Sequence, residues 1–259
     1  MTITLAIMLC TAGADAEWRS LIDAPFEKTF RKPHGDWFHT AAVAVDPKDP
    51  KKLAATPGDG TIIVNGKGRT NNLETVEKFG PIEFHCEFLI PKGSNAGVKF
   101  EKVYEIQIFD SYGKKKISGS DCGGVYPRSE SKPKYHHIDE GIAPLVNACK
   151  PPGEWQTLDV IFVPPEVDKE GKRTAKARLE RATLNDQVIH DKLELEWPTG
   201  NNWKNDPKPT GPILLQADHG PIAFRNVKVR PWKAGASEPS PGARATPAAK
   251  PAETTKPGS

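Results

Sequence analysis

The chain has 259 residues, 36 of them Lys or Arg and 33 Asp or Glu, which gives a formal net charge of +3. Most of the excess positive charge lies beyond residue 232, so the body of the chain is nearly neutral. This balance argues against a nucleic-acid partner, which favours a clustered basic face. No transmembrane span is expected, because no stretch approaches the ~20 apolar residues that a membrane helix needs.

The two ends of the chain differ in composition from its middle. Residues 1–16 contain an apolar run, Leu5–Cys10, followed by small alanines. This pattern predicts a signal peptide and therefore a secreted or periplasmic protein. Residues 233–259 are rich in Pro and Ala and contain no aromatic residue and no Val, Ile or Leu. We expect this segment to be a disordered tail, which leaves residues 17–232 as the folded domain.

The middle of the chain has the pattern of many short strands. Residues 21–23 resemble an edge strand before a turn, and residues 46–59, rich in Pro and charge, are predicted to form a loop. The predicted strands that follow are 61–64, 84–90, 97–101, 103–109, 155–163, 176–184, 187–190, 213–217 and 222–229.

Two connections between these strands stand out. Residues 111–152 are long, polar and irregular, and a loop of this length in a compact domain is usually functional or disordered. Asn185 and Asp186 predict a hairpin turn. Short strands separated by turn signals, with no convincing amphipathic helix, predict an all-β fold, a jelly-roll β-sandwich of two antiparallel sheets.

The most informative strand is residues 103–109. Tyr104, Ile106 and Ile108 alternate with Glu105 and Gln107, so one face is apolar enough for a core while the other carries a carboxylate beside an amide. We interpret the polar face as one that is held open to a ligand. The alternative is an ordinary half-buried strand with its polar residues toward water.

A carbohydrate is the ligand that suits such a face, because carboxylate, amide and guanidinium groups pair with hydroxyls while aromatic rings cover C–H surfaces. The candidates on the strands are His85, Glu87, Lys99, Glu101, Glu105, Gln107, Gln216 and Asp218. The candidates in loops are Tyr126, Arg128, His136, His137 and His219.

No acidic pair has a spacing diagnostic of a glycosidase, which needs two carboxyl groups about 5 to 9 Å apart. Glu105 could pair with Glu87 or Glu101 if their strands are neighbours. Asp110 precedes a turn and either stabilises it or takes part in catalysis. Trp155 is expected either to pack in the core or to contact the ligand. Arg225 is expected either to hold the last strand in place or to bind the ligand.

The cysteines match no zinc pattern, and Cys122 and Cys149 could form a disulfide in an oxidising compartment. No cofactor is required by any motif. Calcium is possible, although no dense run of Asp and Asn demands it. The oligomeric state is left open.

Several motifs occur in the order typical of one family, and the chain resembles the 3-keto-disaccharide hydrolase domain family, formerly a domain of unknown function. These motifs span about residues 60–231. They are Phe84–Phe88, Ser94–Val98, Tyr104–Ile108 with Asp110, Gly123–Tyr126, Pro152–Trp155, Leu184–Asp186, Gly211–Gln216, His219–Gly220 and Phe224–Val227.

The resemblance implies a concanavalin A-like jelly roll and an exported enzyme that acts on glycosides, in some members on sugars oxidised at C3. A 3-keto group makes the C2 hydrogen acidic, so a base can expel the glycosidic oxygen by elimination before water adds. Glu105, His219 and Asp110 are then the catalytic candidates. The substrate-binding candidates are Gln107, Lys99, Tyr126, Arg128, His137 and Gln216.

Residues 17–60 depart from the family pattern, Asp186 replaces a common Gly, and residues 164–175 form a longer loop. The alternative function is a carbohydrate-binding module without catalysis. A shallow, aromatic-lined face with Glu105 in a salt bridge to Lys99 would favour the module, whereas acids and bases that converge in a pocket would favour the enzyme. A third alternative, a purely structural interaction domain, would show an exposed apolar patch instead.

Overall fold

The computed structural model describes residues 16–23, 25–65, 68–206 and 208–235. The predicted signal peptide and tail lie almost entirely outside these residues. Within them, no helix is long and apolar enough to cross a membrane.

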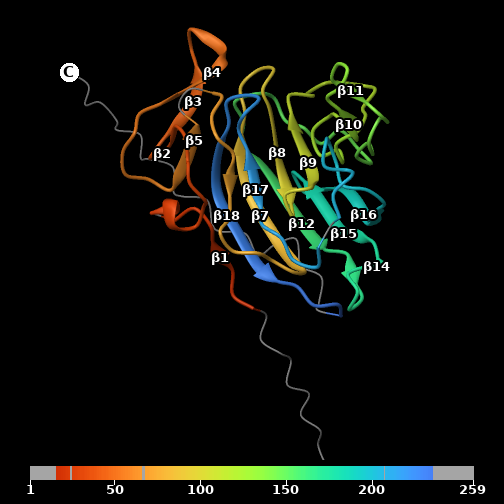
Figure 1. Ribbon diagram of the computed structural model, residues 1–259. Coiled ribbons are helices and arrows are strands. Elements are labelled where there is room, and N and C mark those ends of the chain that lie inside the picture. Colours follow the sequence, from red (N-terminus) through yellow and green to blue (C-terminus); the bar gives the residue numbers. More distant parts are fainter. Residues whose placement is uncertain (1–15, 24, 66–67, 207, 236–259) are drawn as a thin grey trace, which may run out of the picture.

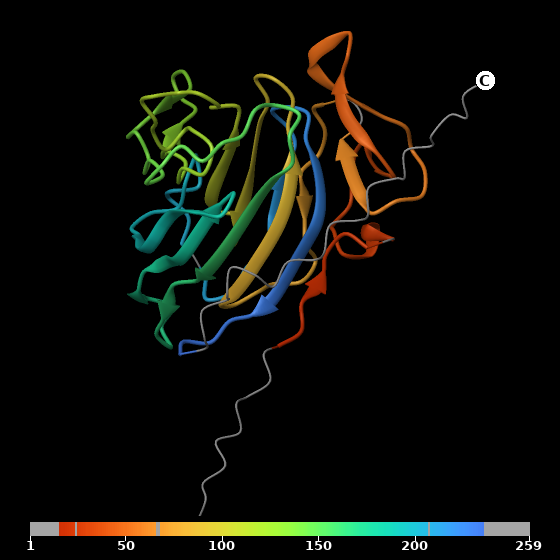
Figure 2. The same ribbon diagram turned by 180° about the vertical axis from the view of Figure 1, so that it is seen from behind.

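The larger of two principal sheets has eight antiparallel strands, and β12, β7 and β18 run side by side in it (Figure 2). Its order is β16 (Gln187–Leu195), β15 (Ala177–Leu184), β12 (Gln156–Val163), β7 (Ile82–Leu89), β18 (Ala223–Pro231), β5 (Ile62–Asn65) and β2 (Trp37–Thr40), and β1 (Arg19–Ser20) also pairs with β18.

The smaller sheet has the order β6 (Leu73–Glu74), β17 (Leu214–Gln216), β8 (Asn95–Phe100) and β9 (Tyr104–Phe109), and it faces the larger one (Figure 1). The core lies between the two sheets. Alternate residues of β7 and β9 enter the same buried cluster, and the rings of Phe100 and Phe162 stack across it with centroids 4.9 Å apart. The predicted jelly-roll sandwich of two antiparallel sheets is confirmed.

Several short elements lie outside the two principal sheets. They are the 3₁₀ helix η1 (Phe26–Lys28) and the strand pairs β3 (Val43–Asp46) with β4 (Asp49–Ala55), β10 (Ser129–Glu130) with β11 (His136–His137), and β13 (Glu166–Val167) with β14 (Arg173–Ala175). The prediction of a loop throughout 46–59 was wrong, because β4 occupies half of it. Its residues are partly or fully exposed, so the hairpin forms without the apolar pattern of a core strand.

The segment 111–152 is less irregular than the sequence suggested. Val125 bridges Ile106 of β9 on one side and Ile142 on the other. Gln107 exchanges two backbone hydrogen bonds with residues 123 and 124. The segment therefore extends the small sheet beyond β9. The predicted hairpin turn is confirmed, since Asn185 and Asp186 have φ angles of 51° and 70°.

The turn between β8 and β9 contains an unusual buried acid. Glu101 has a φ of 52° and is 8% exposed. Neither of its carboxylate oxygens has a hydrogen-bond partner among the described residues. Burial raises the pKa of Glu101 from its ordinary 4.5 to about 8. At neutral pH this carboxyl therefore keeps its proton in the folded chain.

This acid makes the stability of the fold depend on pH. Between pH 4.5 and about 8 the unfolded chain releases the Glu101 proton while the folded chain retains it. Its contribution is therefore fully present below pH 4.5 and is lost as the pH rises through about 8. Near pH 8, Glu101→Gln should have a free energy of unfolding about 2 kcal/mol higher than that of the native chain, as measured by urea denaturation. Near pH 4 the two free energies should be similar.

Glu166→Gln is the matched control, because Glu166 is exposed on β13. It should leave the pH dependence of unfolding unchanged. Equal pH profiles for Glu101→Gln and the native chain would show that Glu101 is not protonated in the fold.

Candidate functional site

Three neighbouring strands of the small sheet place polar side chains on one outer face. Gly97, at the centre of β8, pairs with Gln107 of β9 on one side and with Gln216 of β17 on the other. Lys99 lies opposite Glu105 in the same β8–β9 ladder. Because paired residues of antiparallel strands project to the same side, all five positions share this face.

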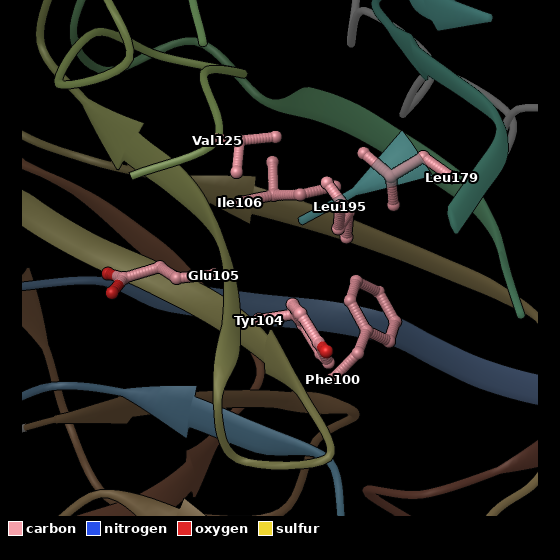
Figure 3. A pocket seen from close by; sticks show the side chains of 7 residues that line it. All are labelled: Phe100, Tyr104, Glu105, Ile106, Val125, Leu179 and Leu195. Atoms are coloured by element: carbon pink, nitrogen blue, oxygen red, sulfur yellow. The ribbon is translucent and has the colours of Figure 1, made fainter. Parts of the chain in front are cut away.

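Glu105 projects away from the core, as the alternation of its strand predicts. Figure 3 shows its carboxylate pointing away from Phe100, Tyr104 and Ile106, which line a gap between the sheets. That gap is too narrow for a water molecule and is therefore part of the core. Glu105 is only 3% exposed, so it lies at the bottom of the polar face rather than on a flat wet surface.

Lys99 and Glu105 form a buried ion pair. The Lys99 Nζ lies 2.9 Å from Glu105 Oε2, and the two side chains are 15% and 3% exposed. Burial raises the pKa of Glu105 above its ordinary value, although the charge of Lys99 opposes this, and the nearby Asp218 raises it further. A carboxyl group so perturbed in a polar site is a candidate for proton transfer.

Gly97, which has no side chain, forms the floor of the polar face between Glu105 and Gln216. A Cβ atom at this position would lie 2.6 Å from Glu105 Oε1 and 3.2 Å from Gln216 Oε1. The missing side chain therefore lets the carboxylate and the amide approach each other across β8.

Two amide oxygens in the site lack partners. Gln107 and Gln216 are 2% and 7% exposed, yet the Oε1 atom of each accepts no hydrogen bond within the described chain. Gln107 Nε2 donates to Asn95 Oδ1 and to the Ser120 carbonyl. Gln216 Nε2 lies 3.3 Å from His219 Nδ1 but does not donate to it, because that nitrogen carries the proton that bonds to Asp218. Buried acceptors without donors call for a ligand that supplies hydroxyl or N–H groups.

His219 and Asp218 follow β17 and adjoin the same face. His219 Nδ1 lies 2.7 Å from Asp218 Oδ1, and both side chains are about half exposed. Donation to Asp218 requires the proton on Nδ1, which leaves the lone pair on Nε2. The charge of His219 lowers the pKa of Glu105, so the two side chains are close to each other. The candidates His219, Gln216 and Glu105 therefore lie together.

Tyr126 borders the site beyond the edge of β9. Its amide donates to the Glu105 carbonyl, and its hydroxyl lies 2.9 Å from the Tyr135 hydroxyl and 3.2 Å from His137 Nε2. Burial, the Tyr135 hydroxyl and the charge of Glu105 all raise the pKa of Tyr126. Two predicted residues, Tyr126 and His137, are thus joined, and His136 lies exposed beside them.

Arg128 is engaged by an acidic side chain and two aromatic rings. Its Nε donates to Asp139 Oδ2 at 2.6 Å, and its guanidinium lies 5.6 Å from the ring centroids of both Trp197 and Trp203. Asp110 accepts a hydrogen bond from the Gly93 amide and so fastens the loop before β8. No contact of either residue with Glu105 is found in the described parts, and their roles at a ligand stay predictions.

His85 and Glu87 do not belong to the site, because β7 is in the larger sheet. The residues that alternate with them are buried in the core, so both face outward on the opposite side of the sandwich. Glu87 binds Arg225, whose guanidinium lies 4.1 Å from the Trp155 ring centroid. Since β7 and β9 are not neighbours, the condition for a pairing of Glu105 with Glu87 is not met.

Glu101 does not supply the second carboxyl either, because it is buried in the β8–β9 turn against Gly211. Cys122 and Cys149 are free thiols rather than a disulfide. Their mutual hydrogen bond lowers the pKa of Cys149 to about 7 and raises that of Cys122.

No group of three or more His, Cys, Asp and Glu side chains in the described parts of the chain could hold a metal ion. Calcium binding stays an untested prediction. The sequence reasoning missed Asn95, the Ser120 carbonyl and the role of Gly97. The motif that contains Asn95 and Gly97 was recognised, but only the pairing of β8 with both neighbours reveals what they do.

A β-sandwich with buried, unpartnered acceptors on one sheet face is suited to a ligand rich in hydroxyl groups. Comparison with known families makes this specific. The chain belongs to the 3-keto-alpha-glucoside-1,2-lyase-like domain family, whose model matches residues 17–230. The resemblance found in the sequence motifs is thereby confirmed.

Solved structures agree with this assignment. The chain is similar to a candidate glycosyl hydrolase from Parabacteroides distasonis ATCC 8503, with 25% identity and a TM-score of 0.53 over 68% of this chain and 74% of that one. A second candidate glycosyl hydrolase from the same organism shares the fold, with 18% identity and a TM-score of 0.53 over 83% of this chain and 100% of that one. No curated protein matches the chain.

The close approach of Glu105 and Gln216 to Gly97 can be tested by adding one methyl group at residue 97. Gly97→Ala would place its Cβ against Glu105 Oε1 and Gln216 Oε1. Overpacking at this point should lower the free energy of unfolding by about 1–3 kcal/mol, as measured by urea denaturation.

Gly58→Ala serves as the control, because a Cβ there meets no atom within 4 Å and the position has no positive φ. It should leave stability unchanged or slightly higher. If Gly97→Ala were as stable as Gly58→Ala, the close approach of Glu105 and Gln216 across β8 would be disproved.

Proposed function

We propose that the protein cleaves a glycoside whose sugar lies on the Glu105 face, and that this sugar carries a ketone at C3. The observation that carries the proposal is the pair of unpartnered amide oxygens, Gln107 Oε1 and Gln216 Oε1, on either side of the Gly97 floor. Sugar hydroxyls are donors that would satisfy both. The family and the two similar structures support a glycosidic substrate.

The chemistry follows from the acidity of the hydrogen at C2 beside a ketone. A base removes that proton, the electrons form an enolate, and the glycosidic C–O bond then breaks as the leaving oxygen takes a proton from an acid. Addition of water to the resulting unsaturated sugar completes hydrolysis. Such a sequence needs one base, one acid and a cation near the enolate rather than two matched carboxylates.

Three side chains suit these roles. His219 is the base, because Asp218 fixes its Nδ1 proton and leaves Nε2 free to accept one. Glu105 is the acid: burial raises its pKa, and it takes up a proton once the substrate's C3 oxygen draws the Lys99 ammonium group away from it. Lys99 is the cation that stabilises the enolate oxygen, because its ammonium group lies beside Glu105 on the same face. Gln107, Gln216 and Tyr126 orient the sugar.

The second candidate is a carbohydrate-binding module without catalysis. The Lys99–Glu105 ion pair favours it, because an acid held by a lysine is less available for proton transfer. Burial of the pair and the convergence of Asp218 and His219 on it favour the enzyme. In either case we propose that the protein acts outside the cytoplasm, on the basis of the apolar segment at its start.

Glu105→Gln separates the two candidates. The amide keeps the shape of the side chain but can no longer supply a proton, so turnover of a 3-keto-glucoside should fall at least about 100-fold. Release of the leaving alcohol is the measurement, and Glu166→Gln is the exposed control that should retain full turnover.

Unchanged turnover in Glu105→Gln would remove Glu105 from the mechanism. A native chain that binds the sugar but releases no alcohol would instead identify the binding module.

A further inference from the structure

Two cysteines of the long segment 111–152 lie together beside the end of β9. Both belong to the core between the sheets, with Cys122 1% exposed and Cys149 7%. The Cys149 thiol donates to the Phe109 carbonyl, with 3.6 Å between sulfur and oxygen. The Cys122 amide donates to Ser111 Oγ at 3.2 Å. The last residues of β9 therefore hold both ends of the stretch 122–149 in one place.

The two thiols also interact with each other. Both are free in the structure, which is therefore that of the reduced protein. The hydrogen bond from Cys122 lowers the pKa of Cys149 to about 7. Hydrogen bonds from Ser111 and Gln156 act in the same direction. A large share of Cys149 is thus thiolate at neutral pH, and the thiolate is the form of cysteine that reacts with oxidants.

The third described cysteine lies in a different environment. Cys86, on β7, is fully buried, and burial raises the pKa of its thiol well above the ordinary value. It therefore keeps its proton and is protected from oxidants. The small exposed area of Cys149 favours attack by a small oxidant over a bulky one. A reactive thiolate next to a second thiol is the arrangement that oxidation converts into a disulfide.

We propose that Cys122 and Cys149 form an oxidation site, at which a peroxide converts the two thiols into a disulfide. The Cys149 thiolate attacks one oxygen of hydrogen peroxide, the O–O bond breaks, and a sulfenic acid and hydroxide form. The Cys122 sulfur then displaces the sulfenic oxygen, which leaves as water with the Cys122 proton. The hydroxide takes the proton that Cys149 had released. Two thiols are thereby oxidised, and one peroxide is reduced to two molecules of water.

The disulfide fastens the segment that extends the small sheet. Cys122 directly precedes Gly123, whose amide donates to the Gln107 carbonyl, and Gln107 Nε2 donates to the Ser120 carbonyl. Closing residues 122–149 into a covalent loop restricts the unfolded chain far more than the folded one. The oxidised protein should therefore be more stable than the reduced one. This inference does not depend on the proposed function, because it requires no ligand.

The test treats the full reduced chain with hydrogen peroxide at pH 7. Mass spectrometry of a non-reducing digest should find one peptide pair joined through Cys122 and Cys149, lighter by two hydrogen atoms than the separate reduced peptides. The midpoint of thermal unfolding should rise by about 10 °C. Dithiothreitol should reverse both changes.

Three variants identify the sulfurs. Cys86→Ala is the control and should keep both the joined peptide pair and the rise in the midpoint. Cys122→Ala and Cys149→Ala should lose both. A cooperative melting transition in reducing buffer reports that each variant is folded, and the digest of the native chain tests the site even if a variant fails to fold.

Three results would overturn the proposal. The first is that the native chain keeps both thiols after peroxide treatment. The second is a disulfide that runs through Cys86 or between two chains, or a Cys149 that is oxidised to a sulfinic acid without a crosslink. The third is a joined peptide pair with an unchanged midpoint, which would show that the bond does not fasten the segment.

Discussion

The arrangement of the site depends on the register between three antiparallel strands. Gly97 pairs with Gln107 and Gln216, and Lys99 pairs with Glu105, so one alternation decides which side chains face the sheet exterior. A shift of a single residue between β8 and β9 would turn the carboxylate into the core and the isoleucines outward. The core residues of β9 thus fix the position of the polar face as firmly as they stabilise the sandwich.

The burial of charge on this face has an energetic cost that the fold must offset. Lys99 and Glu105 leave water together, and a buried ion pair often gains little net stability from its attraction. The two glutamine oxygens add further unsatisfied acceptors. A face that costs stability in the free protein and gains hydrogen bonds from a ligand is typical of a binding site rather than of a structural surface.

The sequence predicted much of the fold but less of the site. Strand alternation was sufficient for β7, β9, β12 and β15, because apolar residues at every second position can only be buried together. The same pattern gave no information on which sheet a strand joins, so it left open a pairing of Glu105 with Glu87 of β7, although the two lie on opposite sides of the sandwich. The β3–β4 hairpin packs Val43, Leu53 and Ala55 only partly against a small cluster, and the segment 111–152 owes its position to tertiary contacts, so local sequence did not predict either of them.

The segment 123–126 has a consequence for the chain as a whole. The last strand of a sheet normally presents free amide and carbonyl groups, which can recruit a strand from another molecule. Here the Gln107 amide and carbonyl bond to Gly124 and Gly123, and those of Glu105 bond to Thr199 and Tyr126. The segment that borders the candidate site therefore also protects β9 against intermolecular strand addition. Shortening it would leave the edge of β9 free to pair with other molecules and to aggregate.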